Sequence, residues 1–168
     1  MKIEFKHKKI LERLYSTNDA EVLDALKELR ETGDKSVVTY LVELLFISKS
    51  ERIKERVENF LKDIKDNQAA GPLALAVNNQ RYEPILDKLL AICWQSGLDF
   101  SDHPRIFTDA AIRGDYQSTI EAFTVLEETI PQLSEERKAE ERDYLKENIT
   151  GMEKDKAILI QELIKQFR

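Results

Sequence analysis

Residues 22–29 read VLDALKEL, and the same pattern of apolar side chains returns along the chain. It recurs at 57–64 (VENFLKDI), at 86–93 (LDKLLAIC) and at 119–126 (TIEAFTVL). In each copy the four repeated positions, which are apolar except at Thr119, follow spacings of 3, 1 and 3 residues, which places them on one face of an α-helix. A lone helix cannot bury such a face, whereas a neighbouring copy stacked beside it can. The recurrence therefore predicts a helical repeat in which equivalent faces pack together.

Composition and helix-ending signals extend this prediction to the whole chain. The 168 residues include only five glycines and four prolines, and no stretch alternates apolar and polar residues long enough to favour a strand. Gly33, Gly97 and Gly114 follow apolar stretches of helical period, as residues that end helices do. Asp115 stands where a helix is expected to begin. Such signals divide the sequence into about ten helices.

We therefore expect an all-α chain that forms one domain over residues 1–168. The expected architecture is an α-α superhelix, a short right-handed solenoid of about five antiparallel helix pairs. Residues 1–17 and 134–168 are expected to act as terminal capping helices, because the end units of a repeat array need a polar outer face.

Two consecutive segments carry a family resemblance. DKSVVTYLVELL at 34–45, followed by FLKDI at 60–64, resembles a HEAT repeat, a unit of two antiparallel helices. In the next unit, NQAAGPL at 67–73 places Pro72 in the first helix, as that family often does. The resemblance covers residues 18–130. It implies an armadillo/HEAT-type α-solenoid.

The following part of the chain is also similar to a second repeat family. Gly114-Asp115-Tyr116, Phe123 and Pro131 resemble the second half of a tetratricopeptide repeat. This family too is built from stacked helix pairs. Both resemblances imply an α-solenoid, so the expected architecture is the same for either.

Charge is unevenly distributed between the two halves of the chain. Residues 1–84 carry 15 basic and 15 acidic side chains, whereas residues 85–168 carry 11 basic and 17 acidic ones, which accounts for the net charge of −6. An acidic surface repels phosphate backbones and attracts cations. The charge pattern therefore disfavours nucleic acid and favours a basic or neutral protein or peptide as the partner.

The position that follows each copy of the repeat supplies candidate binding residues. It is occupied by Arg30, Lys65, Trp94 and Glu127, three charged residues and the single tryptophan of the chain. We call a set of equivalent positions in the four copies a column. A column that is charged in three of its four copies is expected to face solvent. Trp94 is then either a contact residue for a partner, since tryptophan is enriched at binding hot spots, or a residue that packs against the loop that follows.

The loop at 95–103 (QSGLDFSDH) supplies two further candidate partner-binding residues, Asp99 and His103. In one interpretation it is a simple turn in which Leu98 and Phe100 enter the core and Ser101 or Asp102 caps the next helix. In another, Asp99, Asp102 and His103 hold a metal ion, although no second histidine is near in sequence.

Cys93 lies in a repeat column otherwise filled by Leu29, Ile64 and Leu126, so we expect an inert buried thiol. The alternative is a nucleophilic dyad of Cys93 and His103, which would need a thiolate that an apolar column disfavours. Further along, the charged helix that follows Ser134 is expected to be a solvated, ion-paired surface.

A non-enzymatic scaffold is the function that the repeat favours. Stacked units create a long groove without any catalytic group, so we expect a protein or peptide to bind on the concave face, lined by the second helix of each pair. The sequence lacks glycine-rich phosphate loops and the common zinc-protease and hydrolase motifs. We expect no catalytic residue, no cofactor and no bound metal.

An enzymatic alternative stays open. Some HEAT-like proteins process DNA bases, which requires a cationic groove, and the solvent-facing column offers only Arg30 and Lys65 for one. Others bind iron through His-Glu pairs, which neither His7 nor His103 forms.

The last predicted helix supports a third interpretation, a subunit that dimerises through this helix, so the chain is expected to be a monomer or a weak homodimer. Its apolar stripe either joins two copies or covers the open face of the last unit; the stripe consists of Ile160, Leu163, Ile164 and Phe167. The sequence begins without an apolar leader, and its longest apolar run, at 89–94, is far shorter than the ~20 residues of a membrane span. We therefore expect a cytoplasmic protein that makes no membrane contact.

Overall fold

The computed structural model describes residues 5–32 and 35–168, and within these ranges it contains helices and no strand. Gly33, which is expected to end a helix, lies outside the described residues, as does Asp34. The α-helices are α1 (Phe5–Arg13), α2 (Asp19–Thr32), α3 (Val38–Ile47), α4 (Glu51–Lys62), α5 (Ala70–Val77), α6 (Leu86–Ser96), α7 (Pro104–Arg113), α8 (Tyr116–Thr129), α9 (Glu135–Asn148) and α10 (Lys154–Gln166). Short 3₁₀ segments cover Lys35–Val37, Asn67–Ala69, Gln80–Ile85 and Ile130–Gln132. The prediction of an all-α chain is confirmed over the described residues.

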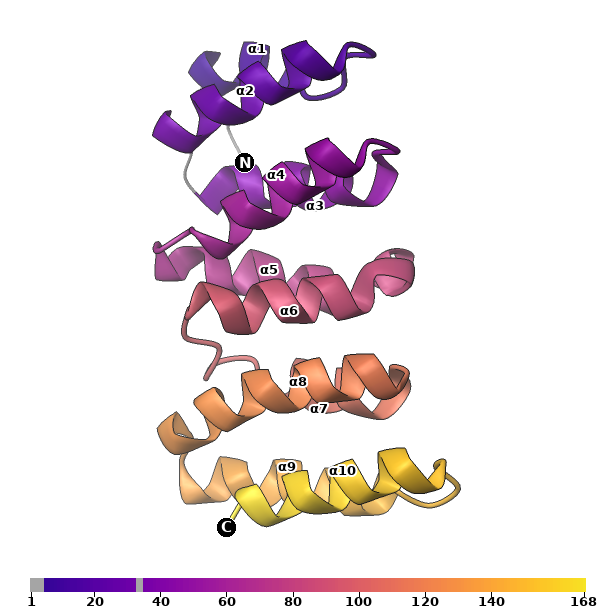
Figure 1. Cartoon of the computed structure of the whole chain (residues 1–168). Coiled ribbons are helices and arrows are strands. Elements are labelled where there is room, and N and C mark those ends of the chain that lie inside the picture. The colour runs from indigo at the N-terminus through magenta and orange to yellow at the C-terminus, as the bar shows by residue number, and fades with distance from the viewer. Residues whose placement is uncertain (1–4, 33–34) are drawn as a thin grey trace.

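The helices form pairs that lie one above the other (Figure 1). Within the pairs, α1 packs on α2, α3 on α4, α5 on α6, α7 on α8 and α9 on α10. Between pairs, α2 packs on α4, α4 on α6, α6 on α8 and α8 on α10, while α3, α5, α7 and α9 follow the same order. The helices therefore lie in two layers, an even layer (α2, α4, α6, α8, α10) and an odd layer (α1, α3, α5, α7, α9). The α1/α2 pair lies at one end and the α9/α10 pair at the other.

The repeated apolar positions fall in the even layer, on α2, α4, α6 and α8 or directly after them. All of them are buried except Ile64 and Phe123, which are partly buried. Ile64 is less buried because α4 ends at Lys62, before the repeat copy is complete. Equivalent faces of successive even helices therefore build one continuous core, as the spacing predicts.

The apolar stripe of α10 is buried within the chain. Ile160, Leu163 and Phe167 have no exposed surface, and Ile164 is partly buried against the core. This helix packs on α8 and α9, which cover its apolar face. The interpretation that this stripe joins two copies is therefore wrong, because its side chains already cover the last unit.

Gly97 and Gly114 follow α6 and α7, as expected, for different physical reasons. Gly97 adopts a left-handed conformation (φ 66°), which favours glycine. At Gly114 a Cβ atom would come within 2.5 Å of the Ser118 Cβ and 2.9 Å of the Ala110 carbonyl oxygen. The turn from α7 into α8 is therefore too tight for a larger residue.

Two carboxylates, Asp115 and Glu43, make the stability of the fold depend on pH in a predictable direction. The backbone N–H of Ser118 donates to Asp115 Oδ1 (2.8 Å) at the start of α8, which lowers the pKa of Asp115. Arg81 donates to Glu43 Oε1 (2.5 Å), and this bond lowers the pKa of Glu43. A pKa lowered by folding contributes stability that is complete above the ordinary value and lost as pH falls through the folded value.

We therefore expect the urea concentration at the midpoint of unfolding to decrease as the pH is lowered from about 6 to about 2.5. In Asp115→Asn, whose amide still caps α8 but does not titrate, the midpoint is expected to fall less over the same range. Circular dichroism at a series of pH values measures both. An Asp115→Asn curve parallel to that of the wild type would contradict the role of this carboxyl.

A buried carboxylate joins α7 to α9. Glu141 has no exposed surface, and its Oε2 accepts hydrogen bonds from Arg105 Nε (2.8 Å) and Thr108 Oγ1 (2.8 Å). Its other oxygen, Oε1, lies 3.6 Å from Arg137 Nε and accepts no hydrogen bond from the described residues. The expectation that the whole helix after Ser134 is a solvated surface is therefore wrong at Glu141, because α9 packs on α7.

Candidate functional site

Trp94 connects the third helix pair to the fourth. Its side chain is partly buried against the core, and its Nε1 donates to Glu121 Oε2 (2.6 Å) on α8. A hydrogen bond of this kind fixes the orientation of the indole. Trp94 therefore contributes to packing between pairs, and part of its surface stays accessible in the even layer.

Two other residues of the predicted column also contact the next pair. Arg30, at the end of α2, forms an ion pair with Asp63, directly after α4. Lys65 Nζ donates to the carbonyl oxygen of Ser96 (2.9 Å), at the end of α6. Glu127 is exposed on α8. The column therefore lies at one edge of the even layer, where most of its members join successive pairs.

The loop between α6 and α7 is held by two apolar side chains, as expected. Leu98 and Phe100 are buried, and the Phe100 ring meets the Phe107 ring edge-on at a centroid distance of 5.0 Å. Asp99 is exposed, and its Oδ1 accepts a hydrogen bond from the backbone N–H of Ser101 (2.9 Å). The Asp99 carboxylate thus shapes the loop while it faces solvent.

His103, rather than Ser101 or Asp102, is the N-cap residue of α7, because the proline that follows takes the first helical position. The expected cap is therefore wrong. His103 is partly buried, with Nε2 facing Gly71 on α5, where a Cβ would lie 3.6 Å away. Among the described residues, no three His, Cys, Asp or Glu side chains are placed to hold a metal ion. The structure does not bring Asp99, Asp102 and His103 together as such a group.

Cys93 is a core residue, as its column predicts. Its side chain has no exposed surface, and burial raises the pKa of the thiol far above its usual value. A thiol in this state is protonated at neutral pH and a poor nucleophile. The burial therefore removes the thiolate on which a Cys93–His103 dyad depends.

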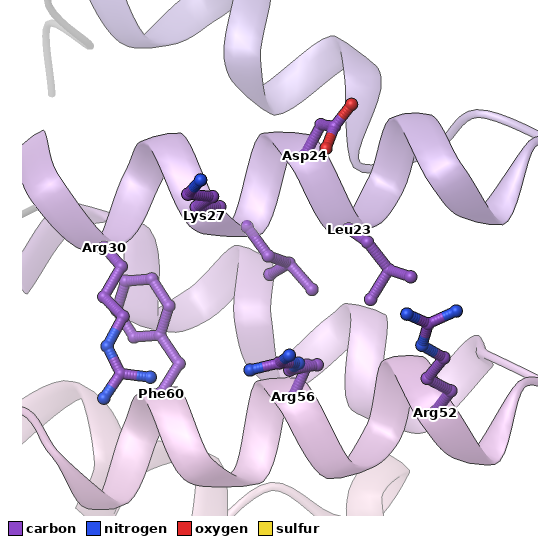
Figure 2. Close-up of a pocket in the computed structure, with 8 residues that line it drawn as sticks. Leu23, Asp24, Lys27, Arg30, Arg52, Arg56 and Phe60 are labelled. Atoms are coloured by element: carbon purple, nitrogen blue, oxygen red, sulfur yellow. The ribbon is translucent and has the colours of Figure 1, made fainter.

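A basic groove lies between α2 and α4, with a volume of about 420 Å³ (Figure 2). We call it the α2–α4 groove. The residues that line it are Leu23, Asp24, Leu26, Lys27, Arg30, Arg52, Arg56 and Phe60. Of these, only Arg30 is a predicted site residue, and the second predicted cation, Lys65, does not line the groove.

The sequence contains a signal for this groove. Arg52 and Arg56 are four residues apart on α4, so they lie one turn apart on the same side of the helix. Lys27 and Arg30 are three apart on α2 and share a side in the same way. The four cations meet only because α2 packs on α4, a contact that the repeat implies once neighbouring copies are placed side by side.

Within the described residues, no helix has both the length and the apolar character that crossing a membrane requires. No protein-family model matches the sequence, no curated protein matches it, and no solved structure matches the chain, so its function must be inferred from its own residues.

Proposed function

We propose that the chain is a HEAT-like α-solenoid scaffold that binds a protein or peptide on its even layer. The observation that supports this proposal is the packing of helix pairs on adjacent pairs over the described chain (Figure 1). In the proposed architecture the pairs form a short right-handed superhelix, with the even layer on the concave side. Such an array presents an extended surface to a partner and needs no catalytic group.

Residues of the even layer give this surface chemical character. The α2–α4 groove contributes cations over an apolar floor, α6 contributes the accessible part of Trp94, and α8 contributes the exposed Glu127. Aromatic and arginine side chains are the types that carry most binding energy at protein interfaces. The proposed binding face therefore combines an aromatic contact with charges of both signs.

Affinity capture from the native cell tests the scaffold proposal. We expect the wild-type chain to recover a stoichiometric protein partner, and Trp94→Ala and Glu127→Lys in the even layer to reduce the recovery about fivefold. Leu75→Ser, at an exposed position on α5 in the odd layer, is the matched control and should leave recovery unchanged. Circular dichroism confirms equal helix content in all variants.

Three results would contradict the proposal. They are the absence of a stoichiometric partner, equal recovery by the wild type and both even-layer variants, and a loss of recovery in the odd-layer control alone.

A further inference from the structure

Most of the cations in the α2–α4 groove are not neutralised by the chain. Arg30 is paired with Asp63, whereas the side chains of Lys27, Arg52 and Arg56 form no hydrogen bond or ion pair with any residue that the structure describes. All three are exposed. Like charges one helical turn apart destabilise each other, so an anion placed among them is favoured.

The single carboxylate of the lining does not compensate these charges. Figure 2 shows the Asp24 side chain on the side of α2 that points away from α4. Arg52 and Arg56 instead extend from α4 into the strip between the two helices. The groove therefore presents a net positive surface within a chain whose net charge is −6.

Apolar side chains form the floor of the groove. Leu26 and Phe60 line the groove and are buried. The partly exposed Leu23 points into the strip between the helices (Figure 2). A ligand that fits must place anionic groups against the rim and an apolar group against this floor. A peptide segment in which carboxylate and apolar side chains alternate offers this combination.

We infer that the α2–α4 groove binds an acidic peptide segment that carries an apolar side chain among its carboxylates. The inference rests on the proposed scaffold function and specifies the chemistry of the partner. It differs from the expectation of a basic or neutral partner, which rested on the charge of the second half of the chain and not on this groove. Arginine suits the role because its guanidinium binds a carboxylate through two parallel hydrogen bonds.

Charge in the rest of the even layer favours a short acidic segment over a long polyanion. Beyond α4, the layer carries Glu121 and Glu127 on α8, and residues 85–168 hold the whole acid surplus of the chain. A nucleic acid that continued from the groove along the layer would meet these carboxylates. A peptide that ends within the groove does not.

Fluorescence anisotropy with a defined probe tests the inference. The probe is a short fluorescein-labelled peptide in which glutamates flank one phenylalanine, titrated with the full chain at about 50 mM salt. We expect saturable binding that becomes about tenfold weaker in the Arg52→Glu, Arg56→Glu double variant. Lys27→Gln, which removes one charge without adding another, should weaken binding by a smaller factor.

The matched control applies the same change of net charge elsewhere. Lys146→Glu with Lys154→Glu alters two exposed lysines at the α9/α10 end and should leave the affinity unchanged. On the peptide side, replacing the phenylalanine by serine should weaken binding severalfold, and replacing the glutamates by lysines should abolish it. Circular dichroism of every variant reports whether the fold is retained.

Four results would overturn the inference. The first is that the wild type fails to bind the acidic peptide, and the second is that the two double variants lose affinity equally. The third is that an oligonucleotide binds more tightly than the peptide and loses affinity in the Arg52→Glu, Arg56→Glu variant, which would make nucleic acid the occupant. The fourth is that sedimentation shows a wild-type dimer that the same variant converts to monomer, which would make a second copy of the chain the occupant.

The scaffold proposal and this inference can fail separately. If the acidic peptide does not bind but Trp94→Ala and Glu127→Lys still reduce capture of a cellular partner, the scaffold stands and the groove assignment is wrong. If the peptide binds but those even-layer variants leave capture unchanged, the groove is an acidic-peptide site and the extended even-layer surface is not the binding face.

Discussion

Replacing Glu141 by alanine is expected to lower the free energy of unfolding by about 3 kcal/mol. The substitution removes the oxygen that accepts hydrogen bonds from Arg105 and Thr108, and it leaves a cavity where α9 packs on α7. Arg105 is 40% exposed, so its guanidinium can turn to solvent, which limits the loss. Thr108 is buried, and without Glu141 its hydroxyl can donate only to the carbonyl oxygen of Arg105 (3.0 Å). Urea unfolding followed by circular dichroism measures the change.

The neighbouring residue provides a matched control for this prediction. Glu140 is half exposed and pairs with Arg137 at 3.1 Å, so Glu140→Ala removes the same chemical group from the surface of the same helix. We expect a loss below about 0.5 kcal/mol, the usual size for an exposed ion pair. Glu141→Gln, which keeps the shape and one acceptor, should lie between the two. Similar losses in Glu140→Ala and Glu141→Ala would show that the buried carboxylate does not stabilise the α7–α9 contact.

Phe107→Ala is expected to destabilise the chain by about 4 kcal/mol, through loss of apolar burial and through the cavity that remains. Phe107 has no exposed surface and lies on α7, a helix that packs on α5, α8 and α9. Its ring also meets the Phe100 ring edge-on, a contact that anchors the loop after α6. The truncation therefore loosens both the middle of the stack and this loop. Urea unfolding gives the change in free energy.

Phe123→Ala serves as the comparison for Phe107. Phe123 is the same residue type on the neighbouring helix α8, but it is only partly buried. We expect a loss of at most about 2 kcal/mol, because less apolar surface is uncovered and solvent can enter the space. An effect at Phe123 equal to that at Phe107 would mean that the burial of these rings does not determine their contributions.

The helices of the even layer could be predicted from the sequence because their burial depends on the spacing of apolar residues within each helix. Apolar residues at intervals of 3 and 4 predict a helix that is buried along the face on which they lie. In a repeat, the equivalent helix of the next copy covers that face. The same holds for Gly97 and Asp115, whose effects involve only residues a few positions away. The burial of Cys93 follows from its column, since equivalent positions in a repeat share an environment.

Features that are built by two helix pairs together could not be predicted in this way. The α2–α4 groove is formed by cations from two helices, and a single column of the repeat includes only Arg30. The burial of Glu141 depends on how α9 is rotated against α7, and a helix with charges on every side gives no pattern from which to predict that rotation. At His103, the effect of the following proline outweighs the better capping side chains before it.

The order of contacts along the chain also determines how the molecule comes apart. Among the helices that the structure describes, the α1/α2 and α9/α10 pairs each have a neighbouring pair on one side, whereas the inner pairs have one on both sides. Detaching an end pair exposes one interface, and detaching an inner pair exposes two. We therefore expect fraying to start at the end pairs and move inward. Cys93 and Phe107, in the middle pairs, are expected to be among the last side chains to meet water, and a protease is expected to cut the outer helices before the central ones.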